Sequence, residues 1–72
     1  MNGLSITGYL KEVASRLTEA TAIAKAAVTC AESGSEREAI RISLDLDEML
    51  HEAQALHRAA TLMNRMERDA TG

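Results

Sequence analysis

The sequence contains no proline, tryptophan or phenylalanine, and Tyr9 is its only aromatic residue. Strands favour aromatic and β-branched side chains, so this lack argues against a β-sheet protein. Cys30 is the only cysteine, which excludes a disulfide within the chain. No apolar run approaches the roughly 20 residues that a transmembrane helix needs, and the first residues lack the pattern of a secretory signal. We therefore expect a soluble, cytoplasmic protein with no membrane contact.

The chain has 72 residues, which is room for one domain, residues 1–72. Ordering a chain costs about 1.5 kcal/mol per residue, and a single small core barely offsets that cost. Small proteins close the gap with disulfides, metals or partner chains. A lone cysteine removes the first route, and the two histidines form no metal-ligand cluster with it. Partner chains are the remaining route.

Apolar residues recur at alternating steps of three and four along both halves of the chain. This heptad spacing is typical of helices that pack at shallow angles. Ala, Leu, Glu, Arg and Met, the strong helix formers, also dominate the composition. We predict a first helix over about 7–32, capped by Ser5 or Thr7, and a second over about 36–68. The two apolar series are Leu10, Val13, Leu17, Ala20, Ala24, Ala27 and Ala31, and Ala39, Ile42, Leu46, Met49, Ala53, Leu56, Ala60 and Met63.

A turn at residues 33–35 separates the two series. Gly34 suits the left-handed position just past a helix C-terminus. Ser35 and Glu38 have the spacing of a capping box, in which the serine caps the second helix and the glutamate reaches back. So short a turn makes the helices antiparallel. The predicted fold is therefore all-α, an antiparallel two-helix hairpin, and its register sets Ala24 opposite Leu46.

Apolar residues outside these series widen the apolar surface beyond one face of each helix. A helix that is apolar over a wide arc needs a second neighbour. The alternative is that these residues are scattered exposed side chains, which any surface carries. We favour a homodimer that forms a four-helix bundle, although a tetramer is also open. The candidates for contacts between chains are Ile23, Val28, Ile40, Leu44, Leu50 and Leu62.

Two patterns on the second helix resemble catalytic or metal-binding motifs. Glu48 and His51 form the Glu-x-x-His pair of di-metal bundles, and Ser43, Asp47 and His51 follow one another at four-residue steps. The apolar series places both sets on the outer face of the helix, where no pocket or further ligand is expected. We therefore predict no enzyme activity, no metal and no cofactor.

His57 and Cys30 each have a structural interpretation and a functional one. His57 flanks the apolar series and is read as a partly buried spacer, or as a pH sensor at an interface, because histidine titrates near neutrality. Cys30 lies among alanines and is read as a small apolar filler. The alternative for Cys30 is a disulfide between two chains.

Charge is unevenly distributed along the chain. Residues 35–57 carry six acidic and two basic side chains, and this acidic segment is either a solvated face or a docking site for a basic patch on another protein. Near the C-terminus, Arg58, Arg65 and Arg68 suit a helix C-terminus or a nucleic-acid contact. The expected architecture is similar to that of Rop-like helical-hairpin dimers, which bind RNA, although no sequence motif is shared.

The function that the sequence favours is a small non-enzymatic module for protein–protein interaction or oligomerisation, regulatory or adaptor-like in kind. The alternative is a nucleic-acid-binding hairpin dimer of Rop-like architecture. Against that alternative, the acidic segment repels a phosphate backbone, and Tyr9 is the only aromatic side chain on which a base could stack.

Overall fold

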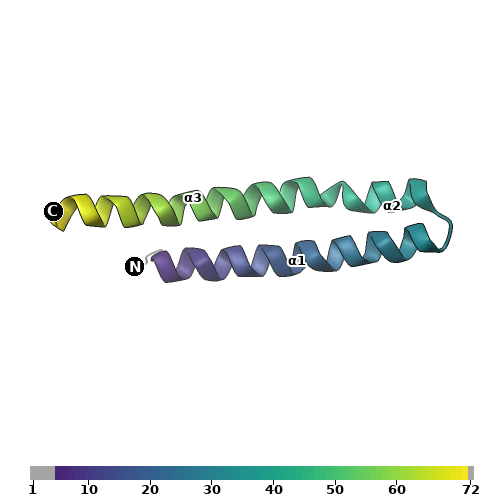
Figure 1. The fold of residues 1–72 in the computed structure, drawn as a ribbon, viewed down its shortest axis with the longest axis horizontal. Coiled ribbons are helices and arrows are strands. Elements are labelled where there is room, and N and C mark those ends of the chain that lie inside the picture. Colours follow the sequence, from purple (N-terminus) through teal and green to yellow (C-terminus); the bar gives the residue numbers. More distant parts are fainter. Residues whose placement is uncertain (1–4, 72) are drawn as a thin grey trace.

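The structure, a computed structural model, describes residues 5–71. The chain forms three helices in order, α1 (Ile6–Glu32), α2 (Glu36–Ser43) and α3 (Asp45–Thr71), and no strand occurs within those residues. Figure 1 shows α2 and α3 following one another along a line beside α1, with the start of α1 and the end of α3 at the same end of the rod. The predicted all-α antiparallel hairpin is confirmed, and it measures 57 × 17 × 15 Å.

The first helix begins at a serine cap. Ser5 has extended backbone angles, φ −107° and ψ 169°, and its Oγ accepts a hydrogen bond from the Gly8 N–H at 3.0 Å. This bond satisfies one of the backbone donors that the first turn of a helix leaves without a partner. Of the two caps that the sequence offers, the chain uses Ser5, and Thr7 lies inside the helix.

The turn at Gly34 closes α1 with two backbone hydrogen bonds. Gly34 has a φ of +97°, and it is the only residue with a positive φ in the described part of the chain. Its N–H donates to Ala31 O at 3.0 Å, and the next N–H, of Ser35, donates to Cys30 O at 3.1 Å. This is the Schellman arrangement, in which a left-handed residue lets the chain turn back onto the last carbonyls of the helix. The predicted left-handed glycine is therefore confirmed.

The predicted capping box does not form. Ser35 precedes α2, but its side chain makes no capping hydrogen bond. In a capping box the Ser35 N–H would donate to the Glu38 carboxylate, but that N–H already donates to Cys30 O. The Ser35 ψ of 63°, far from the extended 169° of Ser5, also turns its hydroxyl away from the α2 donors. Glu38 instead forms an ion pair with Arg41 at 3.8 Å.

The second arm of the hairpin, expected as one helix over 36–68, is divided at Leu44 and extends to Thr71. Leu44 keeps helical angles, φ −61° and ψ −28°. The Ser43 hydroxyl donates to Ile40 O at 2.7 Å, which also accepts the Leu44 N–H. Competition of this kind tightens a helix locally, and the Asp47 N–H accordingly reaches Leu44 O, three residues back, at 3.2 Å. The helix axis continues through this point (Figure 1).

The core between the two arms is thin. The side chains that are buried in the described part of the chain are all alanines, and no large apolar side chain there is fully buried. Larger residues of the second arm, such as Ile42, Leu46, Met49 and Leu56, are half-buried along the predicted apolar series. The buried alanines are Ala20, Ala39, Ala53 and Ala60.

The first arm is rotated relative to the expected packing. Leu10 and Leu17, expected to face the second arm, are 48% and 45% exposed. Tyr9, Arg16 and Ile23, one residue earlier in each heptad, are half-buried instead. These three longer side chains cover more of the second arm than the alternative series, which continues into alanines, and an arginine can lay its apolar stem along such a surface.

Candidate interaction surface

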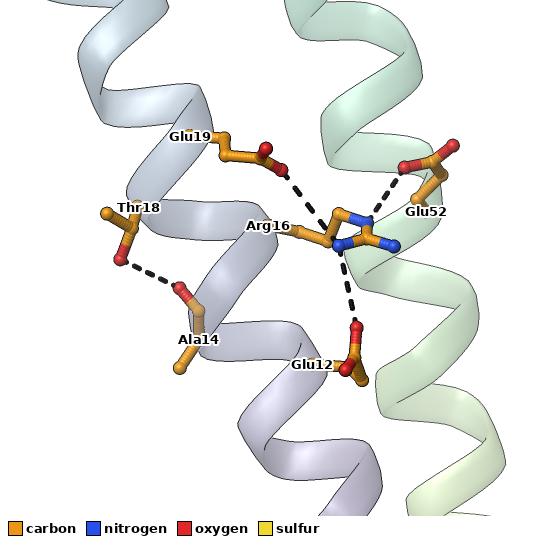
Figure 2. Close-up of polar contacts among 6 residues, drawn as sticks. All are labelled: Glu12, Ala14, Arg16, Thr18, Glu19 and Glu52. Atoms are coloured by element: carbon orange, nitrogen blue, oxygen red, sulfur yellow. Dashed lines mark hydrogen bonds and ion pairs between the residues drawn. The ribbon is translucent and has the colours of Figure 1, made fainter.

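One flank of the hairpin seam carries a cluster of charges centred on Arg16 (Figure 2). The Arg16 Nε–H donates to Glu52 Oε1 at 3.0 Å, which links α1 to α3. Its Nη1 lies 3.5 Å from Glu12 Oε1 and 3.9 Å from Glu19 Oε1, one helical turn away on either side. One guanidinium is therefore shared by three carboxylates from two helices.

This charged flank positions the two arms against each other. The Arg16 side chain is 32% exposed and that of Glu52 is 42% exposed, so water screens their interaction in part. Ion pairs of this exposure contribute about 0.2–1 kcal/mol each. The pair therefore adds little stability, but it shows which side of α1 shares a face with which side of α3. The spacing of Glu12 and Glu19 about Arg16 is visible in the sequence, whereas the contact with Glu52 was missed.

The other flank of the seam carries few charges. Successive residues of an α-helix are about 100° apart, so Leu17 flanks the seam on the opposite side of α1 from Arg16. Leu50 likewise lies on the opposite side of α3 from Glu52. By the same spacing, Arg68 lies in line with Leu50 five turns further along α3, and Asp47 lies beside Leu50 on this side. The heptad positions of Ala14 and Leu17 on α1, and of Leu50 on the second arm from Ser43 onward, contain no Asp, Glu, Lys or Arg, and we call the following residues at those positions the uncharged face. They are Leu10, Ala14, Leu17, Thr21, Ala24 and Val28 on α1, and Ser43, Leu50, His57 and Asn64 on the second arm.

An open hollow of about 470 Å³ lies on the C-terminal half of α1. Its lining includes Thr21, Ala24 and Val28 of the uncharged face, with Lys25 and Thr29 at the outer edge. The small side chain of Ala24 leaves room in this hollow. Large side chains, Leu10 and Leu17, stand on the same face nearer the N-terminus of α1. The uncharged face therefore has protruding leucines at one end and a hollow at the other.

The interface candidates from the sequence fall on different sides of the rod. Val28 is 56% exposed and Leu50 is 49% exposed, and both belong to the uncharged face. Ile23 is half-buried within the hairpin, beside the charged flank. The remaining three lie on the second arm away from the uncharged face: Ile40 (64% exposed), Leu44 (59%) and Leu62 (49%). Leu10, Leu17 and Met66 are also exposed, although the sequence did not single them out as contacts.

The charged and polar candidates are exposed along α3. Arg58, Arg65 and Arg68 are exposed, as are Glu48 and His51. Within residues 5–71, no group of three or more His, Cys, Asp or Glu side chains is arranged to hold a metal ion. No helix in that part of the chain has the length and apolarity needed to span a bilayer.

His57 and Cys30 differ in their surroundings. His57 is exposed on the uncharged face rather than partly buried as expected. Cys30 is half-buried, and its thiol donates to Ser35 O at 3.6 Å across the turn. The cysteine thus contacts the connection between the helices, on the side of α1 that turns towards the second arm.

No protein-family model, curated protein sequence or solved structure matches the chain. The surface itself offers a seam closed on one flank by shared charges and, on the other flank, apolar side chains exposed to water. Such a surface can form a water-free contact with a partner of matching shape.

Proposed function

We propose that this protein is a small non-enzymatic interaction module, and that it works as a homodimer in which two hairpins form a four-helix bundle. In that dimer, each copy covers apolar side chains that the hairpin alone leaves in water. The remaining outer surface, including Ile40, Leu44 and the acidic residues of α3, is then free to contact another protein. A regulatory or adaptor role fits a module of this kind.

The observation that carries the proposal is the amount of surface that the single hairpin exposes. Its accessible surface is 5423 Å². A compact monomer of 7.8 kDa would expose about 4,400 Å², so the excess is about 1,000 Å². The radius of gyration, 16.7 Å, likewise exceeds the roughly 11 Å of a compact chain of this length. One partner in a stable dimer covers about 800 Å², which is close to the excess.

The chemistry of the exposed surface supports the same conclusion. Large apolar side chains stand out on every helix, while the buried core consists of alanines. Burial of a large apolar side chain contributes about 1.5–3 kcal/mol, and a second copy can supply that burial where the hairpin does not. The exposed set is Leu10, Leu17, Val28, Ile40, Leu44, Leu50, Leu62 and Met66.

The test is the mass of the protein in solution. Light scattering on a sizing column, over a hundredfold range of concentration, should give twice the chain mass of 7.8 kDa. Circular dichroism on the same samples should show a helical protein throughout. A well-folded chain that stays at 7.8 kDa at every concentration would refute the proposal, because the apolar face would then be stable in water without a copy of itself.

The Rop-like alternative has one structural observation in its favour. Arg58 and Arg65 lie two turns apart on the outer side of α3, both exposed, and neither has an ion-pair partner among the described residues. Two arginines at that spacing can contact phosphates. The acidic side chains Asp45, Asp47 and Glu48 lie earlier on the same helix and oppose such contacts.

A further inference from the structure

Charge distinguishes the two flanks on which a second copy could dock. Each chain carries a net charge of −3. On the charged flank, Glu12, Glu19 and Glu52 already share one arginine, so a dimer through that side would bring together two sets of carboxylates with too few cations. Covering such groups costs free energy unless each is paired. The uncharged face carries no comparable cluster of carboxylates, so a dimer through it covers fewer charges.

The shape of the uncharged face is complementary to its own copy when the copies run antiparallel. A two-fold axis crossing α1 near Leu17 sets Leu10 of one copy opposite the hollow at Ala24 and Val28 of the other. The same operation places the second Leu10 in the first hollow, as the symmetry of a dimer requires. Large side chains then meet small ones at both ends of the contact.

The same two-fold axis would also cross the second arm, close to Leu50. Because Arg16 contacts Glu52, Leu50 lies nearly level with Leu17 along the rod. The axis that brings together the two Leu17 side chains therefore also brings together the two Leu50 side chains. Four leucines would form the middle of the contact, with Ser43, His57 and Asn64 around them. An apolar centre with a polar rim is the usual anatomy of a stable interface.

We infer that the second copy docks on the uncharged face in antiparallel orientation, with α1 against α1, Leu17 and Leu50 at the two-fold axis, and Leu10 of each copy in the hollow of the other. The inference rests on the proposed function, since it specifies the face and the orientation of that dimer. It adds that Ile40, Leu44 and Leu62 remain outside the contact between the copies.

A matched pair of substitutions on α3 tests the face. Leu50 and Leu62 are the same residue type with the same exposure, 49%, but only Leu50 belongs to the uncharged face. Leu50→Glu should raise the dissociation constant of the dimer at least about 100-fold, because each dimer loses two buried leucines and gains two covered charges. Leu62→Glu should change it by less than about threefold, as a substitution outside an interface does. Light scattering over a concentration series measures both.

Disulfide formation tests the orientation and does not depend on destabilising the dimer. In a Cys30→Ala background, Leu17→Cys should give a disulfide-linked dimer on mild oxidation. Leu10→Cys should not, because antiparallel copies place these two residues about 21 Å apart along the helices. Equal linking at both positions would indicate parallel copies and overturn the orientation.

The outcomes separate the inference from the function on which it rests. A wild-type chain that is monomeric at every concentration refutes both. A dimeric wild type in which Leu50→Glu stays dimeric, or in which Leu62→Glu dissociates the copies, leaves the proposed function standing and refutes the choice of face. Dissociation by Leu50→Glu alone, together with linking at Leu17→Cys alone, establishes the face and the orientation.

Discussion

Replacing Gly34 with alanine should destabilise the hairpin, and the structure assigns the cause to the backbone alone. The φ of Gly34 is +97°, in the region that L-residues rarely adopt. A Cβ built there meets no atom within 4 Å, so no steric contact contributes. The left-handed conformation costs an alanine about 1–2 kcal/mol, and the reduced freedom of the unfolded chain returns about 0.4–1 kcal/mol. We expect Gly34→Ala to lower the free energy of unfolding by about 1 kcal/mol.

Gly8 provides a matched control of opposite sign. It lies in the first turn of α1 with a helical backbone, and an added Cβ would approach the Ser5 Oγ to an ordinary 3.4 Å. Alanine is the better helix former by up to about 1 kcal/mol. Gly8→Ala should therefore raise the free energy of unfolding by roughly 0.5 kcal/mol, the gain being smaller in a first turn than in a helix interior.

Urea unfolding followed by circular dichroism measures both changes. All variants must be compared at one protein concentration, because the proposed self-association would add to the apparent stability. In a domain of this size, about 1 kcal/mol corresponds to a shift of roughly 4–8 °C in Tm. Gly34→Asn should fall between the alanine variant and the wild type, since asparagine tolerates left-handed angles better. A Gly34→Ala protein as stable as the wild type would show that the turn does not need a left-handed residue.

Three further predictions address the charged flank, the cysteine and the arginines. A double-mutant cycle with Arg16→Met and Glu52→Gln should give a coupling free energy of about 0.5–1 kcal/mol in urea unfolding, smaller in high salt; zero coupling at low salt would show that the contact contributes nothing. Mild oxidation of the wild type should give no disulfide-linked dimer on a non-reducing gel, because the proposed antiparallel dimer would hold the two Cys30 residues about 39 Å apart along the helices; linking in dilute solution would contradict this arrangement. The wild type should pass through heparin unretained at low salt, since carboxylates outnumber cations on the second arm; salt-sensitive retention that disappears with Arg58→Gln and Arg65→Gln would favour the nucleic-acid alternative instead.

The hairpin could be predicted from the sequence because its determinants are local. Gly34 sits between two heptad series, and a left-handed glycine after a helix needs no distant contact to form. The predicted capping box does not form, also for a local reason: two hydrogen bonds compete for one backbone donor. Ser35 is both the second residue past α1 and the cap of α2, and its single N–H went to the Cys30 carbonyl. The spacing of Ser35 and Glu38 alone does not reveal that two acceptors, the Cys30 carbonyl and the Glu38 carboxylate, compete for this one N–H.

The face of α1 that packs against the second arm could not be predicted, because two possible heptad series on α1 share half of their positions. Val13 and Ala20 belong to both, and the choice falls between Leu10 with Leu17 and Tyr9 with Arg16. Hydrophobicity favours the leucines. The structure turns the other series inward, where Arg16 reaches Glu52, a residue 36 positions further along the chain. Such a contact depends on the register of the whole hairpin, which residue spacing within one helix does not encode.

That rotation of α1 determines where the hairpin can bind a partner. With the leucines inward, the seam would be filled within one chain, and little apolar surface would remain on that side. With Arg16 inward, the carboxylates of Glu12, Glu19 and Glu52 gather on one flank, and Leu10 and Leu17 are left on the other. Arg16 therefore takes a place in the seam that a leucine could have filled, and Leu10 and Leu17 are left exposed on the uncharged face. In the dimer proposed above, a second copy would recover that burial, because it would bring both the leucines and the hollow that receives them.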